Sequence, residues 1–279
     1  MEIFRTKEGL RLFIDNLKIQ GQSIGFVPTM GALHLGHLSL IEASKSKADI
    51  TIASIFVNPT QFNDKEDFTR YPRTEDEDIL LLQTHKTDAV FIPDVSQMYD
   101  IGEETLAFDL MGLDLRYEGA HRPGHFRGVV TIVDKLFSLV EPDFVFMGEK
   151  DFQQLAIVKL LAKNCFPKIE IIACPTLREA NGLAMSSRNM LLSASERSHA
   201  AVIFETLRQI QEKWNSAPID EILNDVQLKL NIPPLTLEYC AIVDAGSLEP
   251  LSDNAEKTAV ALVAVRLGKV RLIDNLRLH

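Results

Sequence analysis

Two histidines, His34 and His37 in the stretch HLGH, are the first side chains whose type and spacing could do chemistry. They follow an apolar run and precede a segment with helical spacing, so we expect them at a helix N-terminus. Backbone N–H groups and the helix dipole attract anions there. Imidazole N–H donors could also stabilise charge on a transferring phosphoryl group, and Gly36 removes a side chain where a ligand must come close. The motif therefore indicates phosphate binding.

Two other interpretations of this motif stay open. An HxxH stretch also occurs as two ordinary histidines, one buried and one exposed. A zinc site is a weaker interpretation, because the usual helical pair is spaced i, i+4 and the sequence offers no clear third ligand. We therefore expect no protein-held metal. The phosphate interpretation depends on further residues elsewhere in the chain.

Two more polar segments have the chemistry that a nucleotide needs. In FMGEKDFQQ, Gly148 would let a nucleotide lie against the backbone, Lys150 could reach phosphate oxygens, and Asp151 could accept a ribose hydroxyl. MSSRN, at 185–189, offers two hydroxyls and an arginine that could close over phosphates. Each segment could also be a plain solvated turn or a serine-rich surface loop.

A pair of amides, Asn58 and Gln61 in FVNPTQF, follows another apolar run. Polar amides at the end of a strand could hold a small hydroxy acid, or they could fix the loop by hydrogen bonds.

These segments must be positioned by a fold of alternating strands and helices. Short apolar runs rich in β-branched and aromatic residues alternate with segments of helical spacing as far as about residue 175, which predicts a parallel sheet covered on both faces. Ligands bind such sheets at the carboxyl ends of the strands, near the switch in strand order. We expect an α/β fold: a Rossmann-like catalytic domain at 1–175 and a smaller α+β domain at 176–279 that carries the MSSRN loop and closes over the site. The expected strands are 23–29, 49–57, 88–93, 143–147, 169–175, 237–246 and two within 259–276; the expected helices are 38–48, 75–86, 128–140, 151–164, 195–214 and 219–230.

The composition excludes several classes of protein. The 279 residues carry a net charge of −10 with dispersed Lys and Arg, which disfavours nucleic acid as a partner. No apolar run approaches the roughly 20 residues of a membrane span, and the first residues lack a signal-peptide core. Three cysteines without CxxC spacing indicate a reducing compartment. We therefore expect a cytoplasmic protein.

Six ordered stretches together resemble the pantothenate synthetase, or pantoate–β-alanine ligase, family. HLGH and MSSRN are also similar to the HIGH and KMSKS signatures of the wider nucleotidyltransferase superfamily. The chain departs from the family's usual pattern at Met147, Leu177 and Asn181. The stretches that carry the resemblance are PTMGALHLGHLSLI, FVNPTQFN, YPRTEDED, HRPGHFRGVVTIVDKLF, MGEKDFQQL and REANGLAMSSRNMLL.

This resemblance implies an ATP-dependent ligase of coenzyme A biosynthesis. It would condense (R)-pantoate with β-alanine through a pantoyl-adenylate intermediate, giving pantothenate, AMP and pyrophosphate, with Mg²⁺-bound ATP as co-substrate. The family also implies a homodimer formed through the first domain. The alternative is another HIGH-type nucleotidyltransferase that acts on a phosphorylated acceptor, and a nucleotide-sensing protein without catalysis is a third possibility. Gln61 and Gln154 argue against the alternative, because a phosphate acceptor would favour additional Arg or Lys.

The resemblance also assigns roles residue by residue. The catalytic group would be His37, His34 and Lys150. Pantoate would be held by Gln61 and Gln154, with Gln61 also contacting β-alanine. The ATP-binding set would be Met30, Gly31, Ala32, Leu33, His34, Leu35, Gly36, His37, Gly148, Glu149, Lys150, Asp151, Leu177, Met185, Ser186, Ser187 and Arg188.

Overall fold

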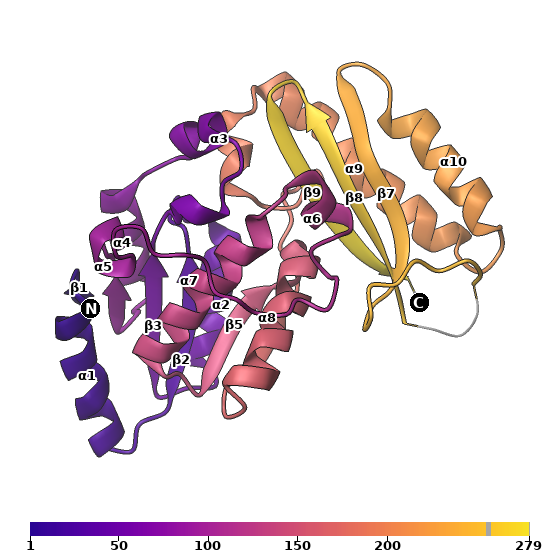
Figure 1. Ribbon diagram of the computed structural model, residues 1–279. Coiled ribbons are helices and arrows are strands. Elements are labelled where there is room, and N and C mark those ends of the chain that lie inside the picture. The colour runs from indigo at the N-terminus through magenta and orange to yellow at the C-terminus, as the bar shows by residue number, and fades with distance from the viewer. Residues whose placement is uncertain (255–257, 279) are drawn as a thin grey trace. The chain divides into compact units, whose positions relative to one another are not determined.

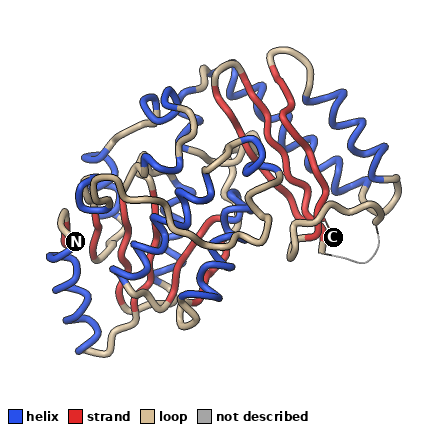
Figure 2. Tube along the Cα trace, in the orientation of Figure 1, coloured by secondary structure: helices blue, strands red, loops and turns tan. Residues whose placement is uncertain are grey.

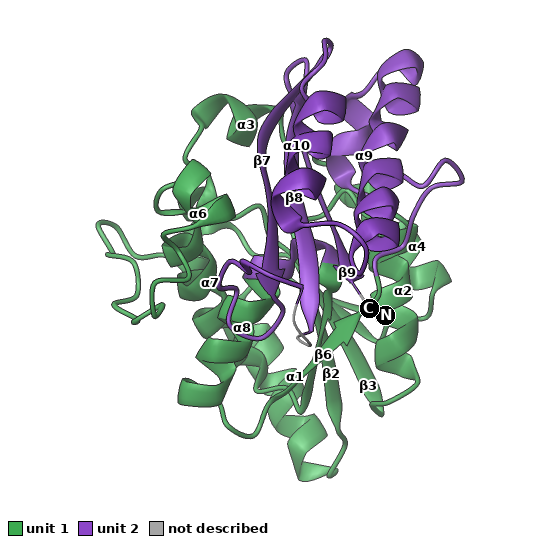
Figure 3. Cartoon of the chain, turned by 90° about the vertical axis from the view of Figure 1, so that its right-hand side faces the viewer, with its two compact units in different colours: residues 1–149, 154–175 green, residues 150–153, 176–279 purple. Residues whose placement is uncertain are grey.

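The chain divides into two compact units. A computed structural model describes residues 1–254 and 258–278. Unit 1 comprises residues 1–149 and 154–175, and unit 2 comprises residues 150–153 and 176–279 (Figure 3). The chain therefore enters unit 2 briefly at 150–153, a segment that lies within the predicted first domain at 1–175. The expected closing of the second domain over a bound nucleotide stays a prediction.

Unit 1 is built on a parallel sheet, as predicted. Its described residues form six strands in the order β1-β4-β3-β2-β5-β6, and every neighbouring pair is parallel (Figures 1 and 2). The five strands predicted for this region all form, and the short edge strand β1 is an addition. The strands are β1 (Glu2–Phe4), β2 (Ile24–Thr29), β3 (Ile50–Ile55), β4 (Ala89–Phe91), β5 (Phe144–Gly148) and β6 (Glu170–Cys174).

Helices bury both faces of this sheet. Successive strand residues enter different hydrophobic clusters, because side chains along a strand point alternately to opposite faces. Phe26 packs with residues of α1, α7 and α8, whereas Val27 packs with residues of α2 and α4. The four predicted helices form as α2, α4, α7 and α8, whereas α1 and the short helices α3, α5 and α6 were not predicted. The helical elements are α1 (Lys7–Ile19), α2 (Leu35–Lys45), η1 (Pro59–Gln61), α3 (Lys65–Arg70), α4 (Glu75–Thr84), α5 (Val95–Met98), α6 (Tyr117–His121), α7 (His125–Val140), η2 (Glu149–Asp151) and α8 (Phe152–Cys165).

The strand order reverses between β2 and β5. From β2 the chain adds β3 and β4 on one side, and from β5 it adds β6 on the other. A ligand crevice forms outside the carboxyl ends of the strands at such a switch point. Within unit 1, HLGH lies in the segment that follows β2, and Gly148 and Glu149 lie where β5 ends.

Unit 2 is the smaller α+β unit that the sequence predicted. Its described part contains an antiparallel sheet of three strands in the order β7-β8-β9. A capping box begins helix α9, since the Ser193 hydroxyl accepts from Glu196 N and the Glu196 carboxylate accepts from Ser193 N. The elements are η3 (Ser187–Leu191), α9 (Ala194–Lys213), α10 (Ile219–Leu230), β7 (Leu235–Asp244), β8 (Ala259–Leu267) and β9 (Val270–Leu278).

Candidate active site

A buried carboxylate shapes the loop between β2 and α2. The backbone N–H groups of Ala32 and Leu33 donate to Asp78 Oδ2 and Oδ1 at 2.8 and 2.7 Å, and Asp78 is 1% exposed. Burial raises the pKa of Asp78, and the two backbone hydrogen bonds oppose that shift. Gly31 has a φ of 78°, and a Cβ there would lie 2.9 Å from Asp78 Oδ2. Asp78 on α4 thus fixes the backbone that leads to His34.

Both predicted histidines cap helix α2 with their side chains. His34 is the N-cap residue, and its Nδ1 accepts from Gly36 N at 3.2 Å. His37 Nδ1 accepts from His34 N at 3.4 Å, and the two ring centroids are 4.0 Å apart. A ring nitrogen that accepts carries no proton, so each neutral ring has its proton on Nε2. The two rings therefore present Nε2–H donors from the first turn of the helix.

Gln61, the last residue of η1, contacts Met30, the residue that follows β2. Gln61 Nε2 lies 3.0 Å from Met30 Sδ, and Gln61 is 8% exposed. Asn58 Nδ2 donates to Gln61 Oε1 and to Gly128 O, both at 3.1 Å, while Asn58 Oδ1 accepts from Tyr99 OH at 2.7 Å. Asn58 thus makes loop-fixing bonds, one of the two interpretations left open above. The pantoate-binding roles of Gln61 and of Gln154, which is half-buried on α8, stay predictions.

The buried His125, which contacts Gln61, was not among the predicted site residues. His125 Nδ1 lies 2.7 Å from Gln61 O, and Arg122 Nη1 lies 3.1 Å from His125 Nε2. An arginine can only donate, so the neutral ring of His125 accepts at Nε2 and donates from Nδ1. This bridge ties α7 to η1. The stretch HRPGHFRGVV contributed to the family resemblance, but nothing in its spacing singled out His125. Asp78 was hidden in a run of four acidic residues, a pattern typical of a solvated helix start.

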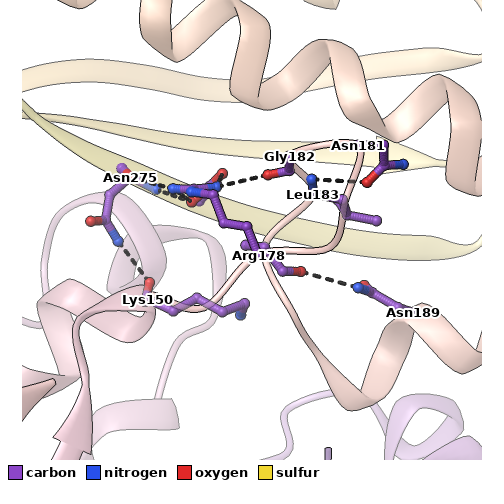
Figure 4. A network of polar contacts seen from close by, with 9 residues as sticks. Lys150, Arg178, Asn181, Gly182, Leu183, Asn189 and Asn275 are labelled. Atoms are coloured by element: carbon purple, nitrogen blue, oxygen red, sulfur yellow. Dashed lines mark hydrogen bonds and ion pairs between the residues drawn. The ribbon is translucent and has the colours of Figure 1, made fainter. Parts of the chain in front are cut away.

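The GEKD turn follows β5 directly. Gly148 ends the strand, and η2 contains Glu149, Lys150 and Asp151. The Lys150 side chain is 18% exposed, and its Nζ lies 3.9 Å from Asp151 Oδ1. The Lys150 carbonyl accepts a hydrogen bond from Asn275 Nδ2 at 2.8 Å, a contact that no sequence pattern predicts (Figure 4).

The loop that ends in MSSRN is a small hairpin. Met185 N donates to Leu177 O at 3.0 Å, which sets two predicted ATP-binding residues side by side. At the tip, Gly182 has a φ of 90°, and Leu183 N donates to Asn181 Oδ1 at 3.1 Å (Figure 4). The Ser186 hydroxyl accepts from Arg188 N at 3.3 Å and begins η3. The Asn181 side chain therefore supports the turn.

Comparison with known proteins identifies the family. The sequence model described as pantoate-beta-alanine ligase matches residues 2–277. The chain belongs to this family. Pantothenate synthetases of Porphyromonas gingivalis and Bacteroides thetaiotaomicron are 45% and 44% identical to it, over 99% of each chain. A pantothenate synthetase structure from Thermus thermophilus matches with a TM-score of 0.92 and 40% identity, over 99% of both chains.

A further ligase of this family was solved with ligands. The pantoate-beta-alanine ligase of Francisella tularensis, complexed with beta-gamma ATP and beta-alanine, matches with a TM-score of 0.83 and 37% identity, covering 99% of this chain and 97% of that one. The family resemblance and the expected enzyme class are confirmed: the chain is an ATP-dependent ligase that joins pantoate to β-alanine. These matches favour the ligase over the alternative nucleotidyltransferase.

The described part of this ligase offers no ready-made metal centre. Across residues 1–254 and 258–278, no group of three or more His, Cys, Asp or Glu side chains could hold a metal ion. Over the same ranges no helix is long and apolar enough to span a membrane.

Proposed function

We propose that the ligase works through pantoyl adenylate. The pantoate carboxylate attacks the α-phosphorus of ATP, the bond to the bridging oxygen breaks, and pyrophosphate leaves. The amine of β-alanine then attacks the acyl carbon, a proton is lost from the nitrogen, and AMP leaves with the electron pair of the broken C–O bond. The observation that carries this proposal is the pair of imidazole rings on the first turn of α2, at the switch in strand order.

We assign His34 and His37 to the phosphates. Nδ1 of each ring accepts a backbone N–H, so each Nε2–H can donate to a phosphate oxygen. Donors aimed at charge that grows in the transition state stabilise it more than the ground state. Lys150 adds a positive charge to the same task, since an ammonium on a flexible stem can follow a moving phosphate.

We assign the other predicted residues to binding the rest of ATP, pantoate and β-alanine. We assign the loop at 30–33, Gly148, Glu149 and Asp151 to the nucleoside and phosphates, together with Leu177 and residues 185–188. Gln61 and Gln154 would hold pantoate, with Gln61 also meeting β-alanine. The contact of Gln61 with Met30 supports this assignment, because it brings a predicted pantoate residue beside a predicted ATP residue.

The proposed metal is Mg²⁺, carried on the phosphates of ATP. Mg²⁺ in nucleotide sites keeps several waters and needs few protein ligands, so the donor set of the described residues fits a metal that arrives with the substrate. We also propose a homodimer, on the family resemblance alone, and a cytoplasmic location. Sedimentation analysis would test the first, with twice the chain mass of 31.3 kDa expected.

One assay tests the function. ATP, pantoate and β-alanine are supplied singly, in pairs and together, while AMP and pyrophosphate are followed. Pyrophosphate should exchange into ATP with pantoate alone, and AMP should accumulate in repeated turnovers only when β-alanine is added. A chain that acts on a phosphorylated acceptor, or one that only senses nucleotides, would show neither.

A further inference from the structure

Strand β9 contacts Lys150 of the GEKD turn and Arg178 of the hairpin that ends in MSSRN (Figure 4). Asn275 Nδ2 donates to the carbonyl oxygen of Lys150 at 2.8 Å. The preceding residue, Asp274, accepts two hydrogen bonds from Arg178, at 2.6 and 3.0 Å. Arg178 lies in the hairpin that continues into 185–188. One pair of neighbouring residues on β9 therefore meets the GEKD turn on one side and the MSSRN hairpin on the other.

Asn275 is itself held firmly in place. Its backbone N–H donates to Asp274 Oδ1 at 2.8 Å, and its carbonyl accepts from Arg178 Nη2 at 3.2 Å. Arg178 also donates to Gly182 O at 3.1 Å and stacks on the Phe204 ring at 3.8 Å. Asn275 and Asp274 are 6% and 4% exposed. A side chain with so little freedom forms its hydrogen bond before any ligand arrives, so ligand binding need not order it.

The chemistry of Asn275 suits a partner of Lys150. Its amide donates to the backbone carbonyl and carries no charge that would compete for the ammonium group. A carboxylate at the same place would lose the donor and would attract the ammonium away from phosphate. Two residues further along β9, the Arg277 guanidinium lies 5.2 Å from the Phe152 ring centroid, so the strand meets this segment at a second point.

We infer that Asn275 is a positioning residue for Lys150, acting through the Lys150 carbonyl to hold the lysine where it meets the phosphates of ATP. This inference rests on the proposed function, which gives Lys150 its role. Asn275 is not expected to touch a substrate.

The test compares variants by pyrophosphate–ATP exchange with pantoate and no β-alanine, with the rate followed against ATP concentration. Asn275→Ala and the nearly isosteric Asn275→Asp should each lower exchange at subsaturating ATP about tenfold, as expected for one lost positioning bond. The matched control is Gln211→Ala, because Gln211 Nε2 donates to Arg277 O at 2.7 Å on the same strand. The Gln211→Ala variant should lower the unfolding midpoint about as much as Asn275→Ala does, but it should leave the exchange rate unchanged.

A double-mutant comparison shows whether the effect passes through the lysine. In a Lys150→Ala background, Asn275→Ala should change exchange less than about twofold, since coupled residues are not additive. Equal loss in both backgrounds, normal exchange in both folded Asn275 variants, or equal loss in Gln211→Ala would each overturn the inference. Normal exchange in Lys150→Ala would instead show that the role proposed for Lys150 is wrong, and the inference would fall with it.

Discussion

An imidazole ring can hold a helix end and donate to a ligand at once, because its two nitrogens point in different directions. In His34 and His37 the Nδ1 atoms accept from the backbone at the start of α2. The same hydrogen bonds leave the ring proton on Nε2, so they both cap the helix and determine the direction in which each ring donates. Replacing either ring therefore removes a cap as well as a donor.

Replacing His37 with alanine should slow adenylate formation roughly a hundred- to a thousandfold. A donor aimed at transition-state charge is worth about 2.7–4 kcal/mol. Pyrophosphate–ATP exchange with pantoate but no β-alanine measures this step alone. His85→Ala is the matched control, since His85 pairs with Glu42 at 3.0 Å on the surface of the same unit and has no proposed role. Exchange at the wild-type rate in His37→Ala would remove His37 from the mechanism.

Gln61→Leu should lower pantoate-dependent turnover roughly ten- to a hundredfold while ATP binding changes little. Leucine is close to glutamine in size but makes no hydrogen bond, and a polar group of the substrate left unpaired costs about 1–3 kcal/mol. Asn58 keeps its bond to Gly128 O, so the η1 loop should survive. Calorimetric titration of ATP is run beside steady-state kinetics in pantoate. If the variant loses affinity for ATP while its dependence on pantoate stays normal, Gln61 contacts ATP and not pantoate.

At the scale of elements, helix α4 determines the shape of the loop before α2. The Asp78 carboxylate uses both oxygens to accept neighbouring backbone N–H groups, and Thr74 Oγ1 donates to it at 3.2 Å. An asparagine has one oxygen in place of two, so it can accept only one of the two N–H groups well.

Asp78→Asn should therefore lower the free energy of unfolding by about 1–3 kcal/mol, the cost of one unsatisfied buried N–H. Chemical denaturation measures it, with the exposed Asp76→Asn of the same helix turn expected to stay within about 0.5 kcal/mol of wild type. The folded pKa of Asp78 is raised from 3.8, so its titration favours folding most below 3.8. That contribution is lost as pH rises through the folded pKa. As pH rises from 3.8 through the folded pKa, the free energy of unfolding of wild type should thus fall relative to that of Asp78→Asn. A difference between the two free energies that does not change with pH would contradict a pKa raised by burial.

Strands with continuous apolar runs could be predicted from the sequence. A short edge strand, which forms by pairing with a neighbouring strand, could not. Strands such as β3 and β5 are buried on both faces and stand out in the sequence. The edge strand β1 has three residues, none fully buried, and gives no such signal. Helix α1 was not predicted, although it does carry such a signal: its buried residues Leu10, Ile14 and Leu17 have helical spacing.

The same distinction applies to the candidate site. HLGH, GEKD and MSSRN were found because residue type and spacing alone suggest phosphate chemistry. Asp78, His125 and Asn275 act on backbone atoms of residues 45, 64 and 125 positions away, respectively. Such partners depend on the fold, and a single sequence does not display them.

For the whole molecule, we expect no stoichiometric zinc. No group of three or more potential ligands exists in the described ranges, and both histidines use Nδ1 to accept from the backbone. Elemental analysis of protein purified without a histidine tag should find well under one zinc per chain, and removal of Mg²⁺ should abolish pyrophosphate exchange. A full equivalent of zinc that disappears in a His34→Ala, His37→Ala double variant would replace the phosphate interpretation with a metal site.

The 125 positions between Lys150 and Asn275 also correspond to a delay during protein synthesis. A ribosome adds about 5–20 residues per second, so roughly 6–25 seconds separate the synthesis of the lysine from that of the asparagine that holds it. During this interval the nascent polypeptide already contains both histidines and the lysine but lacks β9. If Asn275 positions Lys150, the growing polypeptide binds ATP more weakly than the finished enzyme does. Full affinity for the nucleotide then appears only after β9 has been synthesised and folded.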